Sequence, residues 1–280
     1  MEAIAPRRTV DLALWTLVGS LFLAQYFAFV RSLLHIWRTD AEFSYGVLIP
    51  GIVAYLIWLR RERLQKLAKE VWPSGLAIVL VGCGLQVLAS ISGSLFFSGL
   101  ALTTSLMGVT GFIWGRQLLR IIAIPLGFLV LMVPLPSYVL GQLIWRLQTI
   151  ATTMSAKILD WTEVPVFQDG NILKLSNYIL EVKQACSGSR SIFALAALAL
   201  LLGFGLERKW WIRVLLLAAA PILAILANVI RIVGTGLIAS RFGNIAADEM
   251  LHTVWGVLVF TIAVIGLFAF QRFLLWVTTE

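Results

Sequence analysis

Cysteine, histidine and charged residues are all scarce in this chain of 280 residues. It holds two cysteines and two histidines, and charged residues make up 13% of the sequence. Two cysteines exclude a disulfide-stapled scaffold, and with so few histidines beside them they exclude a metal site built from several such ligands. We therefore expect neither a metal nor a cofactor. The small charged share also excludes an ordinary soluble domain, in which about a quarter of residues are charged.

Apolar residues, in contrast, make up 60% of the chain. Because a helix needs about 20 mostly apolar residues to cross a bilayer, the sequence predicts an all-α polytopic membrane protein with about eight transmembrane helices, forming a single integral membrane domain over residues 1–280. The first window is too long for a signal peptide and is expected to be retained. The expected spans are 12–30, 46–59, 75–92, 98–114, 118–134, 191–206, 214–238 and 253–271.

The Lys and Arg residues are unevenly divided between alternate loops. With a cytoplasmic N-terminus, thirteen of the 22 fall on the inner side, and the net charge is +7 inside against +1 outside. Since Lys and Arg in short loops set the orientation, both termini are predicted to be cytoplasmic. The overall charge of +8 therefore reflects orientation in a lipid bilayer, and no nucleic-acid partner is expected.

Residues 135–185 are predicted to form an extracytoplasmic insert. It follows the helix-breaking run Val133-Pro134-Leu135-Pro136. Within it, apolar residues recur at helical spacing from Leu140 to Leu159, while Arg146, Gln148 and Lys157 are expected to face away from them. This pattern is typical of an amphipathic helix on the membrane surface.

The second half of the insert predicts a small β element. Asp169-Gly170 separates two runs rich in β-formers, 164–168 and 171–175, and a third run covers 178–182. Asp-Gly between such runs is a strong β-hairpin signal. The last run leads directly to one of the two cysteines.

That cysteine, Cys186, lies in Ala185-Cys186-Ser187-Gly188-Ser189-Arg190-Ser191, where the sixth span begins. Ser187 or Ser189 suits a helix N-cap, so Cys186 would lie at a helix N-terminus, which favours the thiolate. Arg190 adds positive charge. The alternative is an inert buried cysteine, which is the better interpretation for Cys83 in the apolar run Val81-Gly82-Cys83-Gly84.

Two polar residues interrupt the seventh span. Asn228 and Arg231 are three residues apart and share a helix face, and polar groups within a membrane helix are costly enough to suggest function. Arg231 follows Arg213 by about 27 Å of helix, so we expect it to end the outward-running helix with its head near the outer surface. Snorkelling to lipid headgroups is the alternative.

His252 begins the eighth span, and Glu249 precedes it by one helical turn, where it would orient the imidazole ring. The alternative is a solvated imidazole at the interface. Under the predicted orientation, Cys186, Arg231 and His252 all lie at the outer membrane face. His35 has no such neighbours and is expected to be structural.

A thiolate, an imidazole and a guanidinium at one depth suggest acyl transfer. The thiolate would attack a carbonyl carbon, the imidazole would carry a proton, and the guanidinium would stabilise the oxyanion. Since either water or an amine can resolve a thioester, protease and transpeptidase both stay open. Nothing suggests a metalloprotease or an intramembrane aspartyl protease.

Several ordered motifs resemble those of the exosortase/archaeosortase family of membrane transpeptidases. The similarity extends over about residues 40 to 270. It is carried by Ala185-Cys186-Ser187-Gly188 with Arg190-Ser191, Asn228-x-x-Arg231, His252 with Gly256, Val133-Pro134-Leu135-Pro136, Gly170-Asn171, and Gly46-Val-Leu-Ile-Pro50 with Leu59-Arg60-Arg61. One departure is Ser44-Tyr45-Gly46, where the family often has Ser-His-Gly.

The resemblance implies that Cys186 is the nucleophile, Arg231 the oxyanion-stabilising or substrate-orienting residue, and His252 the proton carrier. His252 favours the bacterial branch, since the archaeal branch typically has Arg there, and it implies a place in the bacterial inner membrane. The implied substrates are secreted proteins with a C-terminal tail made of a short motif such as Pro-Glu-Pro, a transmembrane helix and a basic cluster. They would be cut near the motif and passed to a surface acceptor, commonly in organisms that make exopolysaccharide.

Two other functions are compatible with the sequence. A transporter or lipid flippase would use Asn228 and Arg231 as a substrate site, but it predicts polar residues near the midplane of several helices. A non-catalytic assembly subunit would tolerate replacement of Cys186.

Overall fold

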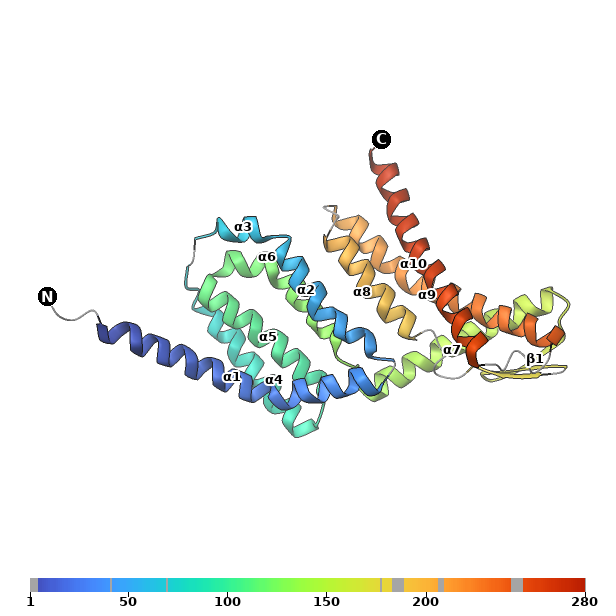
Figure 1. Ribbon diagram of the computed structural model, residues 1–280, viewed down its shortest axis with the longest axis horizontal. Helices are drawn as coiled ribbons and strands as arrows, with labels where there is room; N and C mark the ends of the chain where they lie inside the picture. Colours follow the sequence, from blue (N-terminus) through green and yellow to red (C-terminus); the bar gives the residue numbers. More distant parts are fainter. Residues whose placement is uncertain are drawn as a thin grey trace. The chain divides into compact units, whose positions relative to one another are not determined.

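The computed structural model describes residues 5–40, 42–68, 70–176, 178–182, 189–205, 209–242 and 249–279, apart from the side chains at 5–15, 17–18, 189–190, 249–253 and 279. Most of these residues are helical (Figure 1). The helices are α1 (Ala5–Thr39), η1 (Ser44–Val47), α2 (Leu48–Trp58), α3 (Arg61–Gln65), α4 (Ser74–Ser92), α5 (Leu95–Trp114), α6 (Arg116–Gly127), η2 (Phe128–Met132), α7 (Ser137–Trp161), α8 (Ser189–Gly205), α9 (Trp210–Phe242) and α10 (Glu249–Thr279).

Each of the eight predicted windows coincides with a helical segment, but the count of eight spans is not confirmed. Within the described residues, four helices are long and apolar enough to cross a membrane: α4, α5, α9 and residues 254–278 of α10. The apolar helices Ser44–Trp58 and Ser191–Gly205 are shorter. At 1.5 Å per residue each measures about 22 Å, less than the roughly 30 Å hydrocarbon core.

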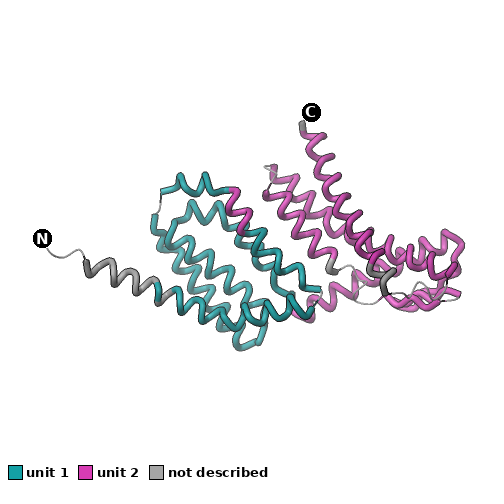
Figure 2. Tube along the Cα trace, viewed as in Figure 1, with its two compact units in different colours: residues 1–53, 60–134 teal, residues 54–59, 135–280 magenta. Residues whose placement is uncertain are grey.

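The chain divides into two compact units (Figure 2). Unit 1 comprises Met1–Val53 and Arg60–Pro134, and unit 2 comprises Ala54–Leu59 and Leu135–Glu280. The residues that the sequence singled out for chemistry all belong to unit 2.

Unit 1 is held together by close packing of α4 against α5. The pair can approach closely because glycines face the partner helix. A Cβ on Gly75 would overlap the backbone of Phe112 and Gly108, and one on Gly82 would overlap Ser105. Small residues permit such contacts between helices in a membrane, where apolar burial provides no drive for association. Tyr26 of α1 shares a hydrogen bond of 3.0 Å with Ser105 of α5.

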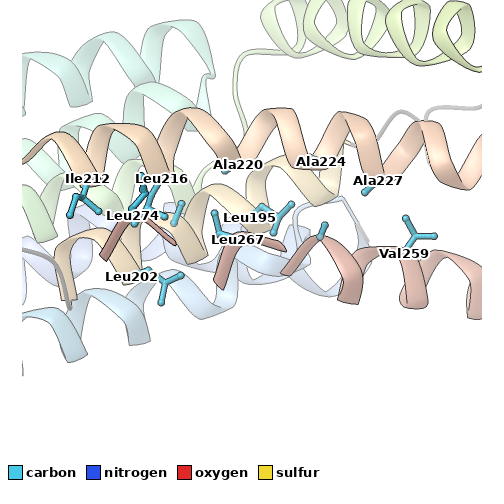
Figure 3. Close-up of a cluster of buried hydrophobic side chains, with 12 residues drawn as sticks. Leu195, Leu202, Ile212, Leu216, Ala220, Ala224, Ala227, Val259, Leu267 and Leu274 are labelled. Atoms are coloured by element: carbon cyan, nitrogen blue, oxygen red, sulfur yellow. The ribbon is translucent and has the colours of Figure 1, made fainter. Parts of the chain in front are cut away.

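Unit 2 has its main core between α8, α9 and α10 (Figure 3). Small buried residues of α9, among them Ala220, Ala224 and Ala227, alternate with larger side chains such as Leu195 of α8 and Leu267 of α10. Alternating small and large residues fill the space between helices at crystal-like density. This packing fixes the part of α9 that leads to Asn228 and Arg231.

The predicted breaker run separates α6 and η2 from α7. Val133 is extended, and it separates the helical residues 116–132 from the helical residues 137–161. They form either a fifth, broken span or a re-entrant loop. Pro134 and Pro136 explain the break, because proline lacks the backbone N–H that a helix requires and disfavours helical geometry in the preceding residue.

Helix α7 confirms the predicted amphipathic helix. Its buried residues include Ile144, Leu147, Ala151, Ser155 and Leu159, which form one stripe at helical spacing,. Arg146 and Lys157 are exposed, as predicted. Because the stripe packs onto protein, α7 uses its apolar face for the core of unit 2.

The expected β element is a three-stranded antiparallel sheet of β1 (Val166–Asp169), β2 (Ile172–Leu175) and β3 (Tyr178–Glu181). Gly170, with φ +60°, occupies the first of the two loop residues between β1 and β2, the glycine position of a type II′ hairpin turn. Leu173 and Leu175 are buried against α7 and α9. On the exposed face, Lys174 contacts Asp169 at 2.7 Å and lowers the pKa of that carboxyl by hydrogen bonding and charge.

Candidate active site between helices α9 and α10

Helices α9 and α10 run antiparallel over most of their length. Successive contacts join Gly234 to Trp255, Leu223 to Gly266 and Lys209 to Thr278, so residue numbers rise along one helix as they fall along the other. The α9 segment that carries Arg231 therefore lies beside the first turns of α10, which contain His252. This pairing brings together the predicted sites at Arg231 and His252, which belong to different helices.

The guanidinium of Arg231 lies against Gly256 of α10. A Cβ on Gly256 would be 3.5 Å from the Cζ atom of Arg231 and 3.6 Å from its Nε and Nη1 atoms. The Nε atom is buried. The guanidinium thus lies within van der Waals reach of α10, and the side chain of Arg231 is directed at that helix.

Gly256 also relates Arg231 to His252. The two α10 residues are four positions apart, so they occupy the same helix face one turn from each other. Arg231 therefore lies along the face of α10 that carries His252 in the first turn of the helix. Acyl transfer by the predicted residues would need the Arg231 guanidinium on the face of α10 that carries His252.

Trp255 fixes how the two helices meet at this point. Its indole Nε1 donates a hydrogen bond of 3.2 Å to the carbonyl oxygen of Arg231. The same oxygen accepts a bond of 2.9 Å from the hydroxyl of Thr235, within α9. The indole ring lies on Gly234, where a Cβ would be 2.5 Å from the ring. Only glycine at position 234 allows the Trp255 indole to reach the carbonyl oxygen of Arg231.

Asn228 is also buried in α9, with 5% of its surface exposed. It precedes Arg231 by three residues and so shares its helix face. A buried amide and a guanidinium therefore lie on one face of α9, between apolar residues. The structure therefore has Asn228 and Arg231 on one face of α9, as the sequence predicted.

The other predicted site residues fall partly or wholly outside the described residues. Cys186 and Ser187 lie in 183–188, between β3 and α8, outside what the structure describes. Arg190 belongs to the first turn of α8, and Glu249 and His252 to the first turn of α10. Their backbones are described, and their side chains are not. The structure thus brings Arg231 to the face of α10 that carries His252 one turn before Gly256.

Arg231 was expected to end the outward-running helix, and this expectation is wrong. Helix α9 continues to Phe242, about three turns further. The extension is stabilised by the insert: Val229 and Ile232 pack with α7 and the sheet, and a Cβ on Gly236 would be 2.9 Å from Leu159. Local hydropathy could not show this contact.

Gln148 was expected to face away from the apolar side of α7, and this too is wrong. It is half-buried and bonded to the end of the sheet, with its Nε2 atom 3.2 Å from the carbonyl oxygen of Val182. Spacing could have indicated it, because Gln148 lies four residues after Ile144 and three before Ala151, on the buried stripe. Trp255 was missed because its partner belongs to another helix.

Within the residues that the structure describes, no three His, Cys, Asp or Glu side chains are grouped as a metal site would require.

Comparison with known proteins gives one match. A family model described as transmembrane exosortase matches residues 37–269, which include the whole of β1–β3, α8 and α9 and most of α10. No curated protein and no solved structure matches the chain.

Proposed function

Because the chain belongs to the transmembrane exosortase family and is an integral membrane protein, we propose that it is a cysteine transpeptidase that removes C-terminal sorting tails from secreted proteins. The observation that carries this proposal is the contact of Arg231 with Gly256, one turn after His252. An acyl-transfer site requires a cationic donor near its proton carrier, and Arg231 lies beside the helix whose first turn carries His252,.

In the first half-reaction the Cys186 thiolate attacks the carbonyl carbon of the scissile peptide bond. A carbon–sulfur bond forms, and the carbonyl oxygen becomes an oxyanion that Arg231 stabilises. As the oxyanion collapses, the carbon–nitrogen bond breaks, and His252 gives a proton to the departing amine. The product is a thioester on Cys186 and a free tail.

In the second half-reaction an acceptor amine or hydroxyl attacks the thioester. His252 takes the proton of the acceptor, the carbon–sulfur bond breaks, and Cys186 returns as a thiolate. Water in place of the acceptor gives hydrolysis by the same steps. Asn228, Arg190 and Ser187 would support substrate binding, and Glu249 would orient His252.

The proposed substrates are secreted proteins with a short motif, a transmembrane helix and a basic cluster at the C-terminus. Such a tail lies in the same bilayer as the enzyme, which raises its effective concentration. With both termini cytoplasmic, the reaction would take place on the outer side of the bacterial inner membrane, and a surface acceptor would receive the protein.

The test compares Cys186→Ala and Arg231→Ala with matched controls in the native host, following the size of secreted proteins that carry such tails. Cys83→Ala removes the other thiol, and Arg241→Ala removes an exposed arginine from the last turn of α9. We expect Cys186→Ala to abolish processing, Arg231→Ala to slow it by about 100- to 1000-fold, and both controls to process normally. Normal processing by Cys186→Ala and Arg231→Ala would refute the proposal.

A further inference from the structure

Three parts of the insert meet at a small hydrogen-bonded cluster. Gln148 of α7 donates from Nε2 to the carbonyl oxygen of Val182, at 3.2 Å, and its Oε1 atom accepts from Nδ2 of Asn171, also at 3.2 Å. Asn171, in the β1–β2 turn, accepts the backbone N–H of Val182 at 2.9 Å. We call Gln148, Asn171 and Val182 the clamp.

The clamp engages both backbone polar groups of Val182. The residue itself is buried, with 3% of its surface exposed, and its side chain belongs to the core cluster that includes Val229 and Ile232 of α9. These two α9 residues flank Arg231 in the helix. Val182 is thus fixed to α7, to the turn and to the α9 segment that carries the candidate oxyanion-stabilising group.

Val182 is also the last described residue before Cys186, which follows it by four positions. Helix α8 begins three positions after Cys186, at Ser189. At the Val182 end of the Cys186 segment, one side-chain bond from Gln148 and one backbone bond to Asn171 hold the chain. The Gln148 amide reaches Val182 from a different helix and also bonds the Asn171 side chain.

We propose that Gln148 and Asn171 are positioning residues that hold the start of the nucleophile segment in register with Arg231. This inference rests on the proposed function, in which Cys186 attacks and Arg231 stabilises. Neither residue touches the substrate; they act through Val182. Reaction rate depends steeply on such placement, since a displacement of about 1 Å costs on the order of 100-fold.

The chain offers a matched control in Gln168 of β1. Its Nε2 atom also joins the sheet region to α7, through a bond of 3.2 Å to Thr153, and it donates to the carbonyl oxygen of Gly170 at 2.9 Å. It makes no bond to Val182. Gln148→Leu and Gln168→Leu therefore each remove one amide link between the sheet region and α7, and of the two only Gln148→Leu removes a bond to Val182.

The experiment measures tail processing and thiol reactivity in the full-length protein with Cys83→Ala, so that Cys186 is the only cysteine. For Gln148→Leu we expect a fall in kcat of about 10- to 100-fold, little change in KM, and an altered pH profile of Cys186 alkylation by iodoacetamide. Asn171→Asp, which loses the Nδ2 donor and keeps the backbone acceptor, should have a smaller effect of the same kind. Gln168→Leu should match the parent in kcat and alkylation.

Thermal unfolding separates positioning from simple destabilisation. Two outcomes would overturn the proposal. One is that Gln148→Leu and Gln168→Leu lose kcat equally at an equal loss of stability. The other is that Gln148→Leu leaves kcat and alkylation unchanged. Alkylation reports on the surroundings of Cys186 whether or not it is a nucleophile. Full activity of Cys186→Ala would thus refute the proposed function, while the alkylation profiles would still decide whether the clamp holds the segment.

Discussion

Trp255 of α10 donates its indole N–H to the carbonyl oxygen of Arg231 in α9 across 3.2 Å. The side chain of the same arginine lies against Gly256, the next residue of α10. A single α10 dipeptide, Trp255-Gly256, thereby contacts both the backbone and the guanidinium of Arg231. The bond fixes the register of the two helices, and the Arg231 guanidinium lies in van der Waals reach of Gly256.

Trp255→Phe should slow tail processing by about 10- to 100-fold. The ring is kept and the N–H donor is lost, so the α9–α10 register loosens, at a cost in stability of about 1 kcal/mol. The matched control is Thr235→Val, which removes the other donor to the same carbonyl oxygen. Since that bond lies within α9, processing should change by less than about twofold. Processing assays and thermal unfolding in detergent measure the rate and the stability of the two variants. Equal losses of processing rate in Trp255→Phe and Thr235→Val would contradict the assigned role of Trp255.

Gly256→Leu should reduce processing by about 100-fold or more, because the new side chain would displace the guanidinium. Gly256→Ala should retain most activity, since its Cβ would be at ordinary contact distance, 3.5 Å from Cζ of Arg231. Gly266→Leu serves as the control: its Cβ would also have its first contact at 3.5 Å, with Leu223, away from Arg231. Initial rates normalised to folded protein measure the effect. A Gly266→Leu variant as impaired as Gly256→Leu would show that helix packing alone is responsible.

Gly82 and Gly84 flank Cys83 in α4 and should respond oppositely to alanine. A Cβ on Gly82 would overlap Ser105 of α5, whereas one on Gly84 meets nothing within 4 Å. Gly82→Ala should therefore destabilise unit 1 by about 1–3 kcal/mol, and Gly84→Ala should be neutral or stabilise by up to about 1 kcal/mol. Thermal unfolding of the purified protein measures both. A Gly82→Ala variant that melts at or above the parent temperature would contradict the close α4–α5 contact.

The predicted orientation can be tested by cysteine labelling with Cys83 and Cys186 both replaced by alanine. Phe167 in β1 and Arg63 in α3 are both exposed, and the charge distribution puts them on opposite sides of the membrane. In spheroplasts, a membrane-impermeant maleimide should label Phe167→Cys at once and Arg63→Cys only after permeabilisation. The reverse pattern would show that the insert is cytoplasmic and would remove the proposed site from the outer face.

The helices were largely predictable because the signals for them are local. Each apolar window coincides with a helix, the two prolines of residues 133–136 end one, and Asp169-Gly170 precedes a turn between strands. Helix length was less predictable: α9 extends past Arg231 because α7 and the sheet cover it. The assignment of the catalytic roles to Cys186, Arg231 and His252 stays a prediction.

The sequence by itself determined that this is a membrane protein with a β-containing insert, since composition and hydrophobic spacing depend only on neighbouring residues. It also marked Asn228 and Arg231 as polar residues in an apolar helix. Only the tertiary structure decided that Arg231 lies on Gly256, that Trp255 bonds its carbonyl oxygen, and that Gln148 holds Val182. Those contacts join residues 24 or more positions apart, and the packing of whole helices and strands determines which distant residues meet.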